Sequence, residues 1–414
     1  MINKGVRIAI IGGGASGIMA AITAARSGAS VIIYEHKDSL ANKILITGNG
    51  KCNFSNLRME SSCFHSSTDK DGRTGRILDK FSVKDCIDFF ESIGVRHRER
   101  KGGIYPYTDT AETVRSALLL ELKSLDVSIV CDCGKLVIGD DRSILADITE
   151  SDRRKKRAKR QYDRIIISCG GCVSPKTGSD GSGYELLRSL DVPLTPIYPA
   201  LTPLIVKEDL SLLKGIRCDA RLCLLREDGS LAESSSGELQ PYDKGLSGIC
   251  AMDISGQACR IMGDGKRAYA EVDFFPVMTD DEFKAELNRR IRLYPERKLN
   301  ELLTGLFAKK LINYLVHPID TRRDGYIDKL CDNVKHHRYE LSPEMLKDFS
   351  RAQTIAGGVP LSAVDDNCML YGHEGIYVAG ELLDSDGVCG GYNLHFAWAT
   401  GMLAGCHAAG YLNA

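Results

Sequence analysis

The stretch VRIAIIGGGASGIMAAITAARSGASVIIYE, residues 6–35, decides the fold of this chain. It starts with an apolar run that predicts a buried strand. The alanine-rich segment 17–26 predicts a helix that ends at Gly28. SVIIYE, residues 30–35, predicts a second strand. A strand, a short glycine turn, a helix and another strand form the βαβ unit with which Rossmann-like nucleotide-binding domains begin.

The turn that joins the first strand to the helix reads Gly12-x-Gly14-x-x-Gly17. Gly12 is expected to make the turn, Gly14 to let the backbone approach a pyrophosphate, and Gly17 to let the helix pack closely on the strand. Glu35 ends the second strand 18 residues after Gly17, where an acidic side chain binds ribose hydroxyl groups. An ordinary turn between a strand and a helix needs none of this register, so the motif predicts a dinucleotide site.

Composition sets the broad class of the protein. The 414 residues suggest two or three domains, and 54 basic against 55 acidic residues give a formal net charge of −1. That balance gives no general reason to expect a nucleic-acid or membrane partner. No signal peptide precedes the first strand, and the apolar run GIMAAITAA is far shorter than the ~20 residues of a spanning helix. We therefore expect a soluble, cytoplasmic protein.

The fifteen cysteines are scattered without regular spacing, which is typical of free thiols in a cytosolic enzyme. No ligand set for a structural metal is present, so no metal is expected. Cys169-Gly-Gly-Cys172 raises the alternative of a redox disulfide. Its glycines suit a turn at a strand end, however, and a pyridine-nucleotide disulfide reductase needs a second GxGxxG motif after a strand. GDG at 263–265 lacks that context.

The character of the chain changes between residues 191 and 351. Prolines cluster first, short alternating strands follow, and two segments between 280 and 316 predict helices. Glycine-rich sequence then returns and leads into a final helix. We expect a nucleotide-binding domain split into residues 1–190 and 352–414, with residues 191–351 as an inserted substrate domain.

The basic run DRRKKRAKR, residues 152–160, has two interpretations. As a functional feature it would be a nucleic-acid patch. As a structural feature it would be the solvated tip of a hairpin. Predicted strands flank it closely on both sides, which favours the hairpin tip.

Three features favour FAD over NAD as the dinucleotide. KILITGNGKCNFSN, residues 43–56, follows Glu35 where an FAD protein needs backbone to wrap a long cofactor. The predicted strand GIYVAGE ends in Glu381, which in two-ended FAD folds meets the ribityl chain or the pyrophosphate. The last helix begins near Leu394, just after GGYN. Its positive end suits the flavin pyrimidine edge, where negative charge accumulates on reduction.

The chain resembles one bacterial flavoprotein family of NAD(P)/FAD-dependent oxidoreductases in the order and spacing of five segments: IGGGASG, KILITGNGKCNFSN, SCGGCVSPKTGSDGSGY, AGGV and AGELLDSDGVCGGYNLHFAWATG. Members of that family carry names that include aminoacetone oxidase and bile-acid 4,6-dehydro reductase. The resemblance implies an α/β fold in which a split FAD-binding Rossmann-like domain holds an inserted β-barrel, about 191–278, and a small helical domain, about 279–335.

The turn motif and the resemblance together assign the cofactor-binding positions. Leu136 is expected to offer its backbone amide and carbonyl to the adenine. Cys52, beside Lys51, is expected to belong to a loop that clamps the cofactor rather than to act as a nucleophile. The full set is Gly12, Gly14, Ala15, Ser16, Gly17, Glu35, Lys43, Asn49, Gly50, Cys52, Asn53, Leu136, Gly170, Gly171, Gly380, Glu381, Gly390, Gly391, Tyr392 and Asn393.

The lack of a second nucleotide-binding motif constrains the chemistry. A nicotinamide reductant must reach the flavin through the open site, so hydride is expected to pass to flavin N5 and then from N5 to an unsaturated substrate. His395, at the start of the last helix, is a candidate proton donor, although a histidine there is often only a cap or a flavin contact. Tyr392 and Thr354 are further candidates.

The leading hypothesis is an FAD-dependent oxidoreductase that reduces an activated, enone-type C=C bond in a small molecule such as a steroid or bile acid, with NAD(P)H as reductant. One alternative is a flavin oxidase that acts on a small amine or aminoketone. Another is a flavin-dependent RNA-modifying or nucleic-acid-binding protein anchored by residues 152–160. His317, Arg322 and Arg323 are either ligands for a substrate carboxylate or carbonyl, or solvated surface. The sequence leaves the oligomeric state open.

Overall fold

The structure is a computed structural model that describes residues 5–149 and 155–410. The chain divides into two compact units. The first comprises Met1–Ile197 and Thr354–Ala414, and the second is Tyr198–Gln353. The first unit therefore takes its residues from both ends of the chain.

A five-stranded parallel sheet forms the centre of the first unit, in the order β20-β11-β1-β2-β7. Its strands are almost entirely apolar where they are buried, as expected for a sheet covered on both faces. The strand β20 comes from the last part of the chain, so the Rossmann-like domain is split, as predicted. The bounds are β1 Arg7–Ile11, β2 Ser30–Tyr34, β7 Ser128–Val130, β11 Arg164–Ile167 and β20 Ile376–Val378.

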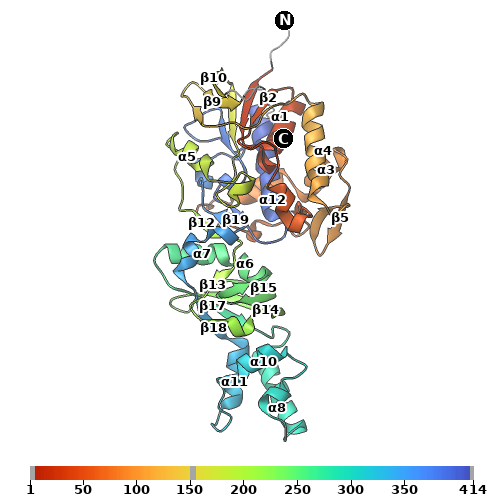
Figure 1. Cartoon of the computed structure of the whole chain (residues 1–414), viewed down its shortest axis with the longest axis vertical. Helices are drawn as coiled ribbons and strands as arrows, with labels where there is room; N and C mark the ends of the chain where they lie inside the picture. Colours follow the sequence, from red (N-terminus) through yellow and green to blue (C-terminus); the bar gives the residue numbers. More distant parts are fainter. Residues whose placement is uncertain (1–4, 150–154, 411–414) are drawn as a thin grey trace. The chain divides into compact units, whose positions relative to one another are not determined.

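Helices α1 (Ala15–Arg26) and α12 (Tyr392–Ala408) lie side by side in this unit (Figure 1). Glycines in α12 allow the close approach. A Cβ atom on Gly401 would lie 2.3 Å from the carbonyl oxygen of Ser16, and one on Gly405 would lie 2.5 Å from that of Ala20. The final helix is thereby tied to the helix that follows the glycine turn.

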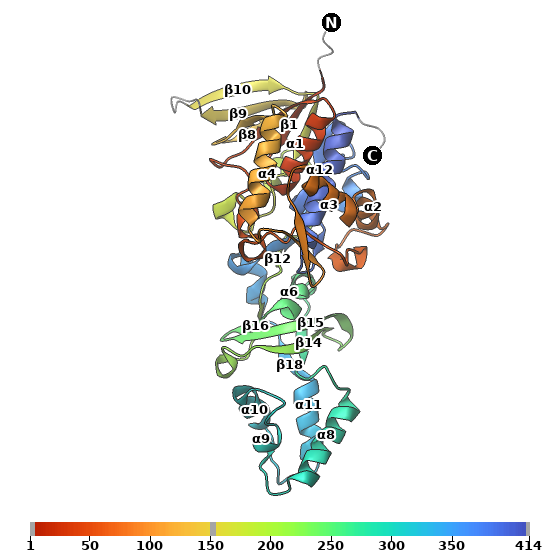
Figure 2. The ribbon, with the colours of Figure 1, turned by 90° about the vertical axis from the view of Figure 1, so that its right-hand side faces the viewer.

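A three-stranded antiparallel sheet, β10-β9-β8, accompanies the parallel sheet (Figure 2). Its strands are β8 Leu136–Ile138, β9 Ser143–Thr149 and β10 Lys155–Gln161. The basic run was expected to form a hairpin tip, but residues 155–160 belong to β10, which pairs with β9 from Lys155↔Thr149 to Gln161↔Ser143. Residues 152–154 lie outside the described residues. The described basic residues therefore stand on a regular strand rather than on a tip.

Smaller elements complete the first unit. The short sheets are β3-β6-β5 and β21-β4. The bounds are α2 Arg73–Lys80, α3 Val83–Ser92, α4 Ala111–Ser124, α5 Ser182–Arg188, β3 Ser55–Asn56, β4 Phe64–His65, β5 His97–Arg100, β6 Gly103–Pro106, β19 Thr354–Ala356 and β21 Asp386–Gly387.

The second unit is built on a six-stranded antiparallel sheet in the order β13-β16-β15-β14-β17-β18. The sheet curls into the predicted barrel, because its two edges meet. Val206 forms a bridge with Leu341, and the amide of Ser342 donates to the carbonyl of Ile205 at 2.8 Å. The bounds are β12 Tyr198–Ala200, β13 Leu204–Ile205, β14 Cys218–Arg226, β15 Leu231–Tyr242, β16 Gly245–Ser247, β17 Ala268–Asp273 and β18 His337–Glu340.

The barrel receives its last strand, β18, only after the helical segment, so the helices interrupt the barrel rather than follow it. Barrel and helices share one apolar core. Lys335 is 4% exposed, and its Nζ binds the Asp273 carboxylate at 2.7 Å, which holds α11 against β17. The helix bounds are α6 Ile249–Asp253, α7 Ser255–Gly263, α8 Asp280–Leu293, α9 Leu299–Leu302, α10 Lys309–Val316 and α11 Tyr326–Lys335. Within the described ranges, no helix has both the length and the apolar character needed to cross a bilayer.

Candidate functional site

The glycine turn after β1 has the geometry that the motif predicts. Gly12 has φ +103°, and a Cβ atom on Gly17 would lie 2.0 Å from the carbonyl oxygen of Gly12. A Cβ atom on Gly14 would meet no atom within 4 Å, so the space beside that residue is open. Helix α1 begins there without a side-chain cap and without an acidic residue in its first turn. Its first amide groups can therefore receive a phosphate.

Glu35 lies beside this turn. One carboxylate oxygen accepts a hydrogen bond from the amide of Gly13 at 2.8 Å, and the other accepts one from the amide of Lys37 at 2.9 Å. The residue is 8% exposed. Each carboxylate oxygen can accept a further hydrogen bond, so the oriented side chain suits a ribose hydroxyl pair.

Lys43, Thr354 and Glu381 come from three distant segments and meet at the Glu381 carboxylate. The Lys43 Nζ lies 2.7 Å from one oxygen, and the Thr354 hydroxyl donates to the other at 3.1 Å. A Cβ atom on Gly171 would lie 2.9 Å from the same oxygen as Thr354, so a larger residue there would displace the carboxylate. Gly170 has φ +72°, which explains why two glycines follow β11.

The loop that contains GNGKCN turns through left-handed backbone at Gly48, Asn49 and Gly50, with φ of 55°, 55° and 80°. Asn53 follows this turn. Its Oδ1 atom is buried and has no hydrogen-bond partner among the described residues. A Cβ atom on Gly391 would lie 2.9 Å from that oxygen. A buried carbonyl oxygen without a donor is rare, and an N–H or O–H group of a ligand would satisfy it.

The second glycine turn, Gly390 and Gly391, leads into α12 with φ of +126° and +97°. The Asn56 side chain donates to the carbonyl of Gly390 at 2.8 Å. The Asn393 side chain accepts from the amide of Gly387 and donates to its carbonyl, so it is used to hold β21. Helix α12 begins at Tyr392, without a side-chain cap and without an acidic residue in its first turn, which leaves a second set of amide groups for a ligand.

Gly380 completes the contacts between the two ends of the chain. Its amide donates to the Thr400 hydroxyl at 2.9 Å, and a Cβ atom on it would lie 2.4 Å from Ser16 Oγ. The strand tip that carries Glu381 is therefore packed directly on the first turn of α1, beside Ala15 and Ser16. The structure brings the predicted residues of both motifs together, apart from the exceptions below.

His395 has an environment that gives no support to a role as proton donor. The side chain is fully buried, with Nδ1 at 2.9 Å from Ser55 Oγ and Nε2 at 3.0 Å from the carbonyl oxygen of Phe81. Because a carbonyl only accepts, Nε2 must carry the proton and Nδ1 must accept from the Ser55 hydroxyl. Burial lowers the pKa of His395 to about 4. The ring is therefore neutral near pH 7 and joins α12 to two other segments.

Tyr392 is also enclosed. It is 6% exposed, its hydroxyl donates to the carbonyl of Arg58 at 3.3 Å, and its ring packs edge-on against Phe64. Thr354 is 4% exposed, and its hydroxyl donates to Glu381, a residue of the predicted cofactor site.

Cys52 is fully buried at a backbone φ of +57°. Burial raises the pKa of its thiol to about 12, so the thiolate is not available as a nucleophile. Its side chain is enclosed by protein, so any cofactor contact at Cys52 would come from its backbone. Burial likewise raises the pKa of Cys169 to about 12 and raises that of Cys172, and both are free thiols. These pKa values argue against a redox pair. Within residues 5–149 and 155–410, no three His, Cys, Asp or Glu side chains are grouped to hold a metal ion.

Two other predicted groups lie apart from the glycine turns. Leu136 is the first residue of β8, an edge strand of its sheet, and pairs with Ala146 of β9. In the second unit, Arg322 and Arg323 are exposed and share Asp320, at 2.9 and 3.6 Å. His317 is exposed as well. This arrangement is that of solvated surface.

A further pair of side chains was not predicted from the sequence. Nδ1 of His65 lies 3.9 Å from the Asp386 carboxylate, and the two residues are partners in the β4–β21 ladder. Asp386 is 3% exposed, and the nearby Asp384 accepts hydrogen bonds from the amide and hydroxyl of Ser67 at 3.2 and 2.5 Å. The pair joins opposite ends of the chain: Asp386 lies in the AGELLDSDGVCGGYN segment, whereas His65 lies outside the quoted motifs. Only the fold reveals it.

The model of the HI0933-like protein Rossmann domain family matches residues 6–407. The chain belongs to this family. The match confirms the resemblance to a bacterial flavoprotein family that the sequence motifs predict.

Relatives of this HI0933-like chain cover nearly its whole length. The "3-dehydro-bile acid delta(4,6)-reductase" of Clostridium scindens is 39% identical over 97% of this chain and 99% of its own length. The "Ribosomal RNA dihydrouridine synthase" of Haemophilus influenzae is 24% identical, over 94% of this chain and 95% of its own. Among solved structures, 3-ketosteroid delta1-dehydrogenase from Sterolibacterium denitrificans aligns with 99% of this chain and 100% of its own, at 10% identity and a TM-score of 0.50. That likeness concerns the fold alone.

Proposed function

We propose that this protein is an FAD-dependent oxidoreductase that reduces a C=C bond conjugated to a carbonyl, in a steroid- or bile-acid-like substrate, with NAD(P)H as reductant. The single observation that carries the proposal is the 39% identity, along almost the entire length of both chains, to a reductase named for 3-dehydro-bile acids. The match covers 97% of the chain, so it spans the inserted unit as well as the Rossmann-like domain.

The residues of the site fit FAD. The open space at Gly14 and the uncapped start of α1 suit a pyrophosphate, and Glu35 suits the adenosine ribose. The buried, unpaired Oδ1 of Asn53 and the uncapped start of α12 offer one acceptor and several donors to a second polar ring. When bound, FAD supplies the redox chemistry, and the protein supplies orientation and protons.

The chain's own residues can prepare the site in two ways. The amide groups at the start of α12 place partial positive charge where a negative charge would develop, which stabilises it. Lys43 and Thr354 each bind one oxygen of the Glu381 carboxylate. This carboxylate is therefore fixed between segments from the two ends of the chain. Thr354, whose hydroxyl proton is bonded to Glu381, is proposed to orient that carboxylate, and His395 is proposed to position α12.

The test is anaerobic. The purified protein is expected to show flavin absorbance, to lose it on addition of NADH or NADPH, and to regain it on addition of a 3-oxo-4,6-diene steroid. The saturated 3-oxo steroid serves as the matched control and should leave the flavin reduced. A protein without flavin that refuses FAD on reconstitution would contradict the proposal, and fast reoxidation by oxygen alone would favour a flavin oxidase of small amines or aminoketones.

A second candidate function is reduction of uridine in RNA. It is favoured by relatives named ribosomal RNA dihydrouridine synthase, at 24% and 23% identity, each over 94% of this chain. The two candidates share their chemistry, because forming dihydrouridine also reduces a C=C bond conjugated to a carbonyl. Replacing Lys156, Arg157 and Lys159 on β10 by Gln and measuring RNA binding and dihydrouridine content separates them. Unchanged, negligible RNA binding favours the small-molecule enzyme.

A further inference from the structure

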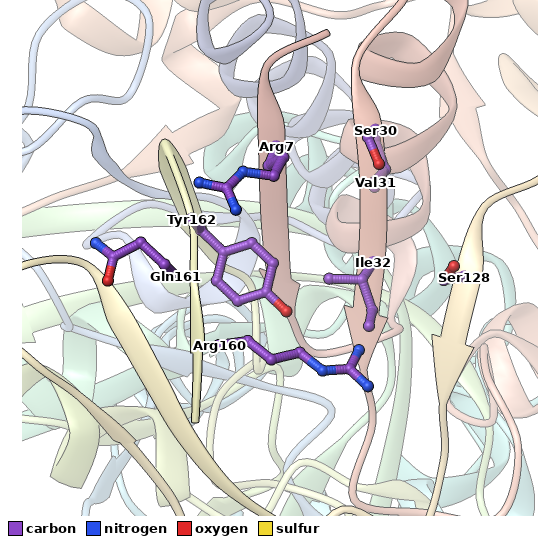
Figure 3. A pocket seen from close by; sticks show the side chains of 8 residues that line it. All are labelled: Arg7, Ser30, Val31, Ile32, Ser128, Arg160, Gln161 and Tyr162. Atoms are coloured by element: carbon purple, nitrogen blue, oxygen red, sulfur yellow. The ribbon is translucent and has the colours of Figure 1, made fainter. Parts of the chain in front are cut away.

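A surface pocket of about 390 Å³ opens at the amino ends of β1, β2 and β7 (Figure 3). Its floor is apolar and buried, formed by Ile32 and the ring of Tyr162. Its rim is polar and exposed, and includes Arg7, Ser128 and Arg160. Five of the eight lining residues are polar or charged, so the pocket is a polar one with a small apolar floor, and its volume falls in the usual range of about 300–1,000 Å³ for small-molecule sites.

The rim carries positive charge. In the view of Figure 3, the Tyr162 ring lies between the guanidinium groups of Arg7 and Arg160. The Arg7 guanidinium lies 3.5 Å from the Asp163 carboxylate, whereas the guanidinium of Arg160 has no ion pair or hydrogen bond with the residues the structure describes. None of the residues that line the pocket is acidic. A guanidinium group binds carboxylate and phosphate through paired hydrogen bonds, so the rim favours an anion.

The pocket is separate from the cofactor site. Arg7 and Ser30 are the first residues of β1 and β2, whereas Gly12 and Glu35 follow the last residues of the same strands. One of the Tyr34 and Tyr162 hydroxyl groups donates to the other at 2.7 Å, so the Tyr162 hydroxyl is engaged within the protein. A molecule in the pocket would therefore meet the Tyr162 ring rather than its hydroxyl, and would not compete for the glycine turn.

We propose that this pocket binds an organic anion with a flat aromatic body, whose phosphate or carboxylate pairs with Arg160 while its ring packs on Ile32 and Tyr162. We infer a flat aromatic ligand because an aromatic ring and a branched aliphatic side chain form the floor of the pocket. The anion follows from the unpaired guanidinium. The site is independent of the proposed redox function.

The test uses the full-length protein as purified and 1-naphthyl phosphate as the probe, with binding measured by titration calorimetry. Arg160→Gln should weaken binding by about tenfold, the effect expected for losing one charge-assisted contact. Lys159→Gln is the matched control, since Lys159 is the neighbouring residue on β10, outside the pocket lining, and lies 3.7 Å from Asp141. This control should bind as the wild type does.

Ser128→Tyr provides a second variant that fills the pocket without changing its charge, and it should abolish binding. Ser128 is an exposed residue on the edge strand β7, so the variant is compatible with the fold. The proposal is overturned if the wild type does not bind the probe, or if Lys159→Gln weakens binding as much as Arg160→Gln. It is also overturned if 1-naphthol or inorganic phosphate alone binds as tightly as the ester.

Discussion

At the scale of single residues, burial decides which reactive side chains can react. His395 and Cys52 both sit in motifs beside the proposed cofactor, and both have side chains that do chemistry in other proteins. Here each is fully buried, which disfavours the charged form of either group. The chain thus uses a histidine and a cysteine at these positions as neutral packing and hydrogen-bonding groups.

His395 predicts a specific pH dependence of stability. Its pKa is about 4 in the folded protein, against about 6.5 in an unfolded chain, so the unfolded state binds the proton more tightly between these values. Stability should therefore fall as pH drops from 6.5 towards 4, by about 1.5 kcal/mol from this group between pH 6.5 and 5. Urea unfolding at both pH values should show this extra loss in the wild type and not in His395→Gln.

The exposed His317 supplies the control for that experiment. His317→Gln changes the same side-chain type at the surface of the second unit and should leave the pH dependence of the wild type intact. Equal pH dependence in wild type and His395→Gln would show that the ring titrates normally, and would reopen its role as a proton donor.

Cys52→Ala should keep its flavin and most of its turnover. The substitution removes one buried sulfur atom, which costs about 1 kcal/mol of stability and leaves the backbone of the loop in place. Native wild-type protein treated with iodoacetamide should remain unmodified at Cys52, while the partly exposed Cys63 reports that the reagent is active. Complete loss of turnover with FAD fully bound would instead assign nucleophilic chemistry to Cys52.

At the scale of elements, the sequence predicts what depends on local spacing and misses what depends on distant partners. The strand–turn–helix–strand start is confirmed, because its glycines stand where local packing leaves no room for a side chain. A Cβ atom on Gly17, for example, would lie 2.0 Å from the carbonyl oxygen of Gly12. The strand β18 was not expected, because a four-residue segment after helices has no period of its own and is ordered by its pairing with β17. The His65–Asp386 pair was not predicted for the same reason, since its residues are distant in the sequence and meet only through the β4–β21 pairing.

The hairpin that contains strand β10 agrees with the prediction, but the position of the basic residues within the hairpin does not. The sequence predicts strands on both sides of the basic run, and a hairpin is present, but the run of charged residues predicts a solvated tip where the structure has a strand. Long basic side chains reach solvent from an exposed strand as readily as from a loop, because their stems lie along the sheet. The charge pattern alone therefore does not separate the two structures.

The βαβ turn yields a prediction in which two glycines behave differently. Gly14→Val adds atoms where the protein leaves open space and where φ is −82°, so the fold should be kept while FAD affinity falls about tenfold or more. Gly17→Ala drives a methyl group into the backbone of Gly12 and should lower stability with or without FAD. Flavin content and the unfolding midpoint of the apoprotein measure the two effects. Equal midpoints for the two variants would contradict this division of roles.

At the scale of the whole molecule, hydrogen bonds within each unit join the segment where the chain leaves that unit to the segment where it returns. In the first unit, the amide of Thr195 donates to the carbonyl of Gly358 at 2.8 Å, and the amide of Gly358 donates to the Thr195 hydroxyl at 2.9 Å. In the second unit, the amide of Gln353 donates to the carbonyl of Leu201 at 3.3 Å. Each unit therefore has neighbouring ends, as an inserted domain requires.

This closure predicts that the first unit survives removal of the second. A chain in which 198–353 is replaced by a linker of about six Gly and Ser residues should fold and retain flavin, because the linker spans ends that are already held together. All proposed FAD-binding residues lie outside the removed segment. If the inserted unit contributes the substrate-binding surface, the shortened protein should no longer be reoxidised by the enone. Loss of flavin would show that the first unit depends on the second, whereas unchanged enone reduction would assign substrate binding to the first unit alone.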